Sequence, residues 1–356
     1  MHPQNQPAIG NFNINDEHFK PDFESSTDQS QNCDELFLVR TANHWMEQAS
    51  LRPVPRMLFD KFWYEGELCI LFADSNLGKS ILAVQIGNNI CSGETTEPFL
   101  LQAGKQPVLY CDFELTDKQF EARYSAEYQG HYAFKEDFYR AELNPDSELP
   151  SGFEGFDEYL NYALERAIVQ TKAKVIIIEN LTYLRSETER AKDALPLMKH
   201  LKSLKNKYGL SILALAHTPK RDVGQPINKN DLQGSKMLMN FCDSAFTVGE
   251  SQADKSLRYL KQIKQRNTGE VYGTDNVCLC QIAKPYNFLQ YEFVGYGREW
   301  DHLKRPKESE SDHLMAEAVE LKQQGLSLRE IGRKLGLQHQ KVDRLIKASE
   351  KKVIGH

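Results

Sequence analysis

Eight consecutive residues carry the clearest chemistry in this sequence: Ala73-Asp74-Ser75-Asn76-Leu77-Gly78-Lys79-Ser80. An apolar run at 68–72 precedes them, and a stretch with helical periodicity at 81–90 follows. A strand, a loop ending in Gly-Lys-Ser and a helix together make the phosphate-binding P-loop. Backbone N–H groups of such a loop face an anion, and the helix N-terminus adds the positive end of its dipole. We therefore expect this segment to hold the phosphates of a nucleotide.

Within this loop, two side chains have separate predicted tasks. Lys79 is expected to reach the β- and γ-phosphates of ATP, and Ser80 to bind Mg²⁺. The first position is Ala73, where the usual pattern has Gly, and Ala fits there if its φ stays negative. The sequence thus predicts ATP and Mg²⁺ as ligands. The alternative is a chance strand–turn–helix that happens to contain Gly-Lys-Ser.

Two carboxylates follow predicted strands. Glu114 comes just after the strand at 108–113, at the edge where open α/β sheets bind ligands. There it would polarise a water in line with the γ-phosphate. The alternative is that Glu114 only lies at the start of a helix and has no catalytic role. Glu179 follows the apolar run at 175–178 and is predicted to support Mg²⁺. Asp is usual at that place and Glu is one methylene longer, so the alternative is that Asp112 shares this task.

The next apolar strand, 211–216, ends at His217. A polar group there can contact the γ-phosphate and report its loss to the following loop, although a lone His is often satisfied locally. That loop, 218–234, is polar and contains Gly and Pro. Its basic residues are predicted to contact DNA: Lys220, Arg221 and Lys229.

Lys264 and Arg266 lie two residues apart on a predicted strand, so they share one face. Paired cations in this position could neutralise phosphate charge across a subunit boundary, as arginine fingers do. A solvated edge strand protected by Lys and Arg is the alternative.

Composition narrows the class of protein. The 356 residues carry a net charge of −6, with 40% hydrophobic and 26% charged residues, which is typical of a soluble globular protein. The sequence has no apolar run long enough for a membrane span and no signal-peptide pattern. Seven scattered cysteines without a Cys-x-x-Cys pair indicate reduced thiols. We therefore expect a cytoplasmic protein without membrane partners.

Segment composition predicts four regions. Residues 1–35 are polar, acidic and disordered, 36–303 form the nucleotide-binding domain, 304–311 are a charged linker, and 312–356 form a small helical domain. In the large domain, strands alternate with helices, which predicts an α/β fold with a mainly parallel sheet. Strands without helices follow Asp243 and are expected to add hairpins to that sheet. The predicted strands are 68–72, 108–113, 138–143, 175–178, 211–216, 245–248, 258–264, 277–283 and 289–294. The predicted helices are 36–50, 80–91, 116–127, 156–171 and 191–208.

The last region contains three helical patterns, at 312–324, 327–335 and 338–347. Ser327-Leu328-Arg329-Glu330 is a capping box, and Gly336 makes the next turn. This arrangement is similar to a helix-turn-helix. In that case the third helix presents four residues to the major groove or its phosphates: His339, Gln340, Lys341 and Arg344. A small helical module for oligomerisation or partner docking is the alternative.

Taken in order, these motifs resemble the RecA-like core ATPases, in particular the hexameric replicative helicases of the plasmid RepA and DnaB kind. The resemblance covers residues 57–294. It matches Glu114 to the catalytic Glu, 175–179 to the Walker B strand, and His217 with 218–234 to the sensor and DNA-contacting loop. Gly234, Ser235 and Asp243 match a Gly-Ser that begins a helix before an Asp. Lys264-Gln265-Arg266 matches the Lys-x-Arg that acts on a neighbour's nucleotide.

The resemblance implies an ATP-hydrolysing motor that assembles as a homo-oligomer, with a hexamer favoured. Single-stranded DNA would occupy the ring, and duplex DNA would contact the C-terminal domain. Replication of a plasmid, phage or mobile element fits such a chain. Two alternatives stay open: an ATP-switched DNA-binding regulator that does not unwind DNA, and a signalling ATPase with protein partners.

Overall fold

The computed structural model describes residues 37–181, 194–219, 221–232, 235–304 and 310–354. It divides into two units between Val54 and Pro55. In the first unit, α1 (Ala42–Ser50) begins where the Thr41 side chain accepts a hydrogen bond from the His44 N–H. The helix predicted from residue 36 therefore starts later, because this cap fixes its first turn and residues 37–41 lie outside it.

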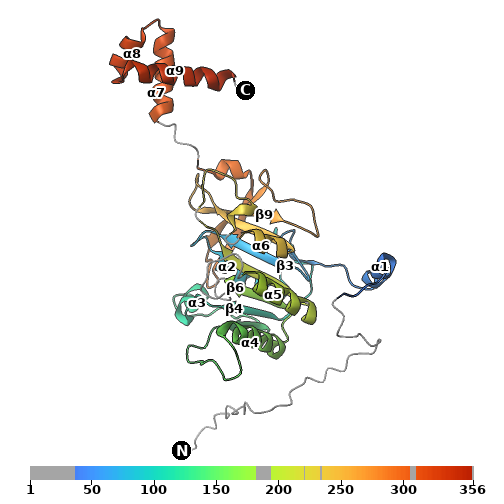
Figure 1. Cartoon of the computed structure of the whole chain (residues 1–356). Coiled ribbons are helices and arrows are strands. Elements are labelled where there is room, and N and C mark those ends of the chain that lie inside the picture. Colours follow the sequence, from blue (N-terminus) through green and yellow to red (C-terminus); the bar gives the residue numbers. More distant parts are fainter. Residues whose placement is uncertain (1–36, 182–193, 220, 233–234, 305–309, 355–356) are drawn as a thin grey trace, which may run out of the picture. The chain divides into compact units, whose positions relative to one another are not determined.

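The described part of the second unit contains one nine-stranded sheet and a separate two-stranded pair. The sheet order is β11-β10-β9-β8-β3-β7-β6-β4-β5, and the strands from β8 to β5 in this order run parallel. The parallel strands are β3 (Leu68–Ala73), β4 (Val108–Asp112), β5 (Phe138–Ala141), β6 (Val175–Glu179), β7 (Ser211–His217) and β8 (Ser244–Glu250). Figure 1 shows helices on both sides of this sheet. The predicted α/β class with a mainly parallel sheet is confirmed.

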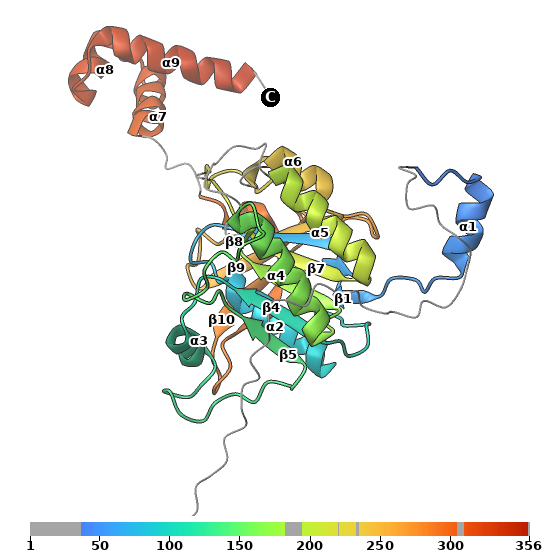
Figure 2. The same ribbon diagram turned by 60° about the horizontal axis from the view of Figure 1, so that its bottom comes forward.

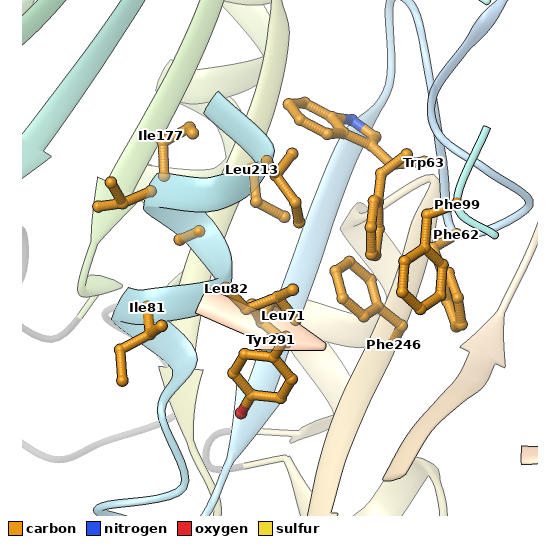
Figure 3. Close-up of a cluster of buried hydrophobic side chains, with 14 of the residues drawn as sticks. Phe62, Trp63, Leu71, Ile81, Leu82, Phe99, Ile177, Leu213, Phe246 and Tyr291 are labelled. Carbon is orange, nitrogen blue, oxygen red and sulfur yellow. The ribbon is translucent and has the colours of Figure 1, made fainter. Parts of the chain in front are cut away.

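Two apolar layers enclose the sheet. One face packs on α2 (Lys79–Ser92) and on the pair β1 (Met57–Phe59) and β2 (Trp63–Tyr64). Figure 3 shows this layer, with Leu82 of α2 near Leu71 and Tyr291 of the sheet. The opposite face is covered by α4 (Phe156–Thr171), α5 (Ala194–Tyr208) and α6 (Ser235–Phe241). Figure 2 shows α4 and α5 on the same side of the sheet.

The four strands after α6 complete the sheet. Strand β8 pairs parallel with β3, and three antiparallel strands then extend the edge: β9 (Leu257–Lys264), β10 (Val277–Ala283) and β11 (Gln290–Gly297). The predicted hairpins are therefore β9 to β11, whereas β8 belongs to the parallel part. Helix α3 (Asp117–Arg123) is shorter than predicted, because Tyr124 already leaves the helical conformation (φ −121°, ψ 37°), and Glu127 and Tyr128 then have positive φ.

The last three helices form a small cluster of their own. They are α7 (Glu310–Gln323), α8 (Leu328–Leu335) and α9 (His339–Ile354). Ala318, Ile331 and Val342 form the buried centre, one from each helix. The capping box between Ser327 and Glu330 is present, and Gly336 ends α8 with φ 64°. Helix α9 extends beyond the predicted end at residue 347.

The described residues also bear on the cysteines and on membrane-spanning helices. The six described cysteines are all buried and none is in a disulfide, as expected for reduced thiols. None of the helices within the described residues has the length and apolar character needed to cross a membrane.

Candidate nucleotide site

Parallel strands place their carboxyl ends at one edge of the sheet, so the segments that follow β3, β4, β6 and β7 meet there. The pairing of β3 with β7 and of β4 with β6 shows which strand-end residues are neighbours. Ala73 at the end of β3 pairs with His217, and Asp112 at the end of β4 pairs with Glu179. The P-loop, Glu114, Glu179 and His217 are thereby brought together from four elements.

The P-loop backbone turns sharply between β3 and α2. Asn76 has φ 63°, and Gly78, the N-cap of α2, has φ 88°. The positive φ favours glycine there, and a Cβ at Gly78 would also lie 2.6 Å from Ile282 Cδ1, so that side chain would have to move. Ala73 is the last residue of β3, where φ is not positive. The Gly-to-Ala departure is therefore compatible with this loop.

Lys79 is the buried cation of the loop, with 6% exposure. Its Nζ lies 3.3 Å from the carbonyl oxygen of Ala73, 3.5 Å from that of Asp74 and 3.2 Å from His217 Nδ1. Burial lowers the pKa of the Lys79 amine, while nearby carboxylates oppose the shift. An anion placed in the loop would give this charge a stronger partner than the present carbonyl groups.

Glu179 lies beneath the first turn of α2 and is 1% exposed. It accepts hydrogen bonds from the Ser80 hydroxyl and from the Tyr110 hydroxyl. Burial raises the pKa of Glu179 to about 7, although both hydrogen bonds oppose the rise. Burial also raises the pKa of Tyr110, which therefore stays protonated and donates. The hydroxyl of Ser80 and a carboxylate thus lie side by side, a donor set that suits Mg²⁺.

Asp112 has a different role from the metal alternative considered for it. Its Oδ1 accepts from the backbone N–H groups of Glu114 and Leu115, and its Oδ2 pairs with Arg140 Nε at 2.9 Å. The Asp112 side chain is fully buried. It fixes the turn that carries Glu114, which leaves Glu179 as the carboxylate beside Ser80.

Glu114, Asn180 and His217 form a contiguous polar cluster. The Asn180 amide donates to Glu114 Oε1, and Asn180 Nδ2 lies 3.0 Å from His217 Nε2. His217 Nε2 also lies 3.6 Å from Glu114 Oε1. The contacts with His217 and Asn180 lower the pKa of Glu114, so this carboxyl stays ionised. Through Lys79, the cluster continues to the P-loop.

The segment after β7 is attached to the P-loop. The Thr218 hydroxyl donates to Asp74 Oδ1, and Arg221 Nε lies 3.7 Å from Asp74 Oδ2. The Arg221 side chain is only 7% exposed. In this conformation, Arg221 is a buried partner of the P-loop, and its contact with DNA stays a prediction. Lys229 is exposed at the start of a 3-10 helix, whereas Lys220 and Gly234 lie outside the described residues.

Lys264 and Arg266 lie away from this cluster. Arg266 pairs with Asp243 at 3.1 Å, and Asp243 Oδ2 accepts from the N–H of Leu68, the first residue of β3. The P-loop follows the other end of β3, roughly 16 Å away along the strand. Lys264 Nζ donates to the carbonyls of Met239 and Cys242 at the end of α6, while Arg266 is 52% exposed. Of the two, Arg266 is the more accessible cation.

The predicted DNA-reading residues of the third helix are all on its surface. His339, Gln340, Lys341 and Arg344 are exposed, and Val342 and Leu345 of the same helix are buried. A groove beside them is lined by Arg329, Gly332, Arg333, Gly336, Leu337, Gln338, His339 and Gln340. A Cβ at Gly332 would lie 2.6 Å from the Leu337 carbonyl oxygen, so glycine permits the tight turn between α8 and α9.

Sequence reasoning missed several residues of the site. Asn180 immediately follows Glu179, and Thr218 immediately follows His217. Their position next to predicted site residues could have identified them. Tyr110 and Arg140 had no such signal, because their roles depend on how β4, β5 and β6 pair. Within the described residues, no group of three or more His, Cys, Asp or Glu side chains could hold a metal ion alone. A P-loop Mg²⁺ does not need one, since phosphate and water supply most of its ligands.

Comparison with known proteins agrees with this geometry. No curated protein matches the sequence. A family model described as an AAA domain matches residues 38–223, just over half of the chain. The matched region contains the P-loop, Glu114, Glu179 and His217. Proteins with this domain are P-loop ATPases in type, which agrees with the mainly parallel sheet and the nucleotide site at its carboxyl edge. The chain belongs to the AAA domain family.

Proposed function

We propose that this protein is an ATP-hydrolysing, DNA-associated motor with a RecA-like core, of the ring-forming replicative helicase type. The observation that carries the proposal is the polar cluster at the carboxyl edge of the sheet. It places a P-loop lysine and a second, ionised carboxylate in one chain of contacts, and the Ser80–Glu179 pair is adjacent to that chain in the sequence. Nucleotide binding alone does not require that second carboxylate, whereas hydrolysis does.

Each residue has a task in this proposal. Lys79 leaves its backbone carbonyls and neutralises the β- and γ-phosphates, while the loop N–H groups hold the phosphate oxygens. Ser80 and Glu179 would hold Mg²⁺, which polarises the phosphate oxygens when bound. Glu114 orients the attacking water, because it is ionised and follows β4 at the same edge. His217 faces the γ-phosphate position and reports its presence to the segment after β7.

The position of Arg266 supports the proposed assembly. Its distance from the P-loop of its own chain rules out a role in that site, so any phosphate that it contacts must belong to another chain. Its exposure and its position at the opposite edge of the sheet are compatible with such a contact in a ring. Lys264 is the weaker candidate, since its amine already binds two carbonyls at the end of α6.

DNA contact is proposed at two places. Lys229 is exposed in the loop after β7 and would face single-stranded DNA in the ring. The surface of α9 with Lys341 and Arg344, together with the groove that contains Arg329 and Arg333, would contact duplex DNA. Positive charge on that surface supplies salt-dependent phosphate binding.

An ATP-switched DNA-binding regulator is the second candidate. It is favoured by one observation, the hydrogen bond from the Lys304 N–H to the Val223 carbonyl at 3.1 Å. This contact joins the segment held by the P-loop to the residue that begins the linker to the three C-terminal helices. Such a connection could change DNA binding without strand separation.

The test combines three measurements on the full chain. The motor proposal predicts ATPase activity stimulated by single-stranded DNA, displacement of a strand from forked DNA, and a native mass of about six subunits. Lys79→Ala protein is the control for each activity. ATPase activity and duplex binding without any strand displacement would favour the regulator. An inactive wild-type protein with correct fold and bound Mg²⁺ would contradict both candidates.

A further inference from the structure

We propose that Asn180 is a positioning residue that sets the tautomer of His217, so that nucleotide binding moves the imidazole proton from Nε2 to Nδ1. The inference rests on the proposed ATP-binding function. The inference adds a defined proton position to that function: with ATP bound, His217 presents its Nδ1–H to the γ-phosphate. Without nucleotide, the same nitrogen accepts a hydrogen bond from Lys79.

The geometry around His217 carries this inference. Lys79 Nζ lies 3.2 Å from Nδ1, and Asn180 Nδ2 lies 3.0 Å from Nε2. Glu114 Oε1 lies 3.6 Å from Nε2. Asn180 is 3% exposed and Lys79 is 6% exposed, so water does not easily replace either contact. The ring therefore has a donor at each nitrogen.

The orientation of the Asn180 amide is determined by Glu114. Its Nδ2 donates to the Glu114 carboxylate, which is ionised because its pKa is lowered. Turning the amide would place Oδ1 against that carboxylate, and two acceptors in contact are unfavourable. The NH₂ group must therefore face Glu114, and its second hydrogen is available to His217.

A neutral imidazole has one donor nitrogen and one acceptor nitrogen, so it cannot accept from both sides. Lys79 and Asn180 thus compete for one acceptor. In the ligand-free chain, the charge-assisted contact from Lys79 is the stronger of the two. It favours a lone pair on Nδ1 and a proton on Nε2, which then faces Glu114. Protonating the ring would leave both donors without an acceptor.

Nucleotide binding removes this competition. Lys79 turns to the phosphates, and Nδ1 no longer receives its hydrogen bond. Nε2 can then accept from Asn180, and the proton moves to Nδ1, on the side that Lys79 has left. The resulting N–H can donate to a γ-phosphate oxygen. Loss of the γ-phosphate removes that acceptor, so the tautomer depends on the nucleotide state.

The experiment measures the tautomer directly. Full-length protein with ¹⁵N-labelled histidine is examined by NMR at about pH 8, without ligand and with a non-hydrolysable ATP analogue and Mg²⁺. The chain has ten histidines, and His217→Gln identifies the resonance of interest by its loss. Wild-type protein should change from the Nε2–H to the Nδ1–H form when the analogue binds.

Two variants test the role of Asn180. Asn180→Ala removes the donor to Nε2, and Asn180→Asp replaces it with an acceptor that favours Nε2–H. Both should keep the Nε2–H form with the analogue bound. Thermal unfolding identifies a variant that fails to fold, and the other variant then carries the test. If either folded variant changes tautomer as wild type does, the inference is wrong. Calorimetric failure of wild-type protein to bind the analogue would instead contradict the proposed function.

Discussion

Arg221 Nε lies 3.7 Å from Asp74 Oδ2, and this ion pair joins the segment after β7 to the P-loop. The Arg221 guanidinium also donates to the carbonyls of Asp222 and Gln225. Farther along, the backbone N–H of Ile227 donates to the fully buried Glu299 at 2.7 Å. The segment is therefore held at both ends by the core, and Arg221 organises it from inside.

This arrangement separates two residues that composition alone would group together. Lys229→Met should lower the salt slope of single-stranded DNA binding by about one, because one phosphate contact is lost. Arg221→Met should leave that slope unchanged and lower ATP turnover, because Asp74 loses its cation. Titrations at several salt concentrations check both. An equal loss of slope in the two variants would mean that Arg221 turns outward when DNA binds.

Lys79 and Glu114 should give different kinetic defects. Lys79→Ala removes the charge that meets the phosphates, so ATP binding should be lost. Glu114→Gln keeps the size and hydrogen bonding of the side chain but removes the carboxylate that orients water. It should bind ATP normally and hydrolyse it roughly 10²-fold more slowly, the scale of general-base effects.

Calorimetry and steady-state turnover distinguish these outcomes. Glu179→Gln is the matched carboxylate substitution, and its defect should depend on Mg²⁺. Normal hydrolysis by Glu114→Gln together with none by Glu179→Gln would reverse the roles assigned to the two carboxylates.

Arg266 offers a test of assembly. Arg266→Ala should bind ATP normally, since its own P-loop is intact. It should hydrolyse ATP poorly, because each site then lacks the cation supplied by its neighbour. Mixing it with Lys79→Ala protein should restore part of the activity, because mixed rings contain sites with an intact P-loop next to an intact Arg266. Lys264→Ala serves as the comparison, and its main effect should be lower stability through loss of the α6 carbonyl contacts. No recovery in rings shown to be mixed would place Arg266 outside the neighbour's site.

The predicted helices and strands agree best with the structure where the apolar residues follow a single regular spacing. The predicted bounds of α4 and β10 agree with the structure: α4 is an amphipathic helix, and β10 is a short, mostly apolar run. The site residues that follow parallel strands could be found for the same reason. Arg221 could not be placed, because a basic loop with Gly and Pro indicates exposure. Its buried state depends on Asp74, which the fold brings near from a distant part of the chain.

The C-terminal helices should separate DNA binding from catalysis. Deleting residues 309–356 should leave basal ATPase activity unchanged, because every described contact of the nucleotide site lies earlier in the chain. Duplex binding should weaken, and Lys341→Met with Arg344→Met in the full chain should lower its salt slope by about two. Gln324→Met, just after the end of α7, is the control. An unchanged slope combined with loss of the oligomer would make these helices an assembly module.

The raised pKa of Glu179 predicts how stability depends on pH. Its folded-state pKa is about 7, above the ordinary value of 4.5, because burial disfavours the charged form. Between these values the folded state keeps a proton that the unfolded state has released, so stability falls as pH rises through this range. The difference corresponds to about 3 kcal/mol above pH 7. The hydrogen bonds from Ser80 and Tyr110 oppose this rise in the pKa of Glu179, the neighbouring carboxylates of Glu114 and Asp112 add to it, and Glu179 in turn opposes the lowering of the Lys79 pKa.

Glu179→Gln removes this titration and keeps one acceptor oxygen, so one of the Ser80 and Tyr110 hydroxyls keeps its acceptor and the other turns to accept from the new NH₂ group. Ligand-free Glu179→Gln protein should therefore be more stable than wild type at pH 8, and the difference should disappear toward pH 4.5. Denaturant unfolding at several pH values, without Mg²⁺ or nucleotide, measures it. Asp112→Asn is the contrasting variant: it should be destabilised at both pH values, since it breaks the buried pair with Arg140. A Glu179→Gln effect that is constant with pH would show that Glu179 is already ionised in the folded chain.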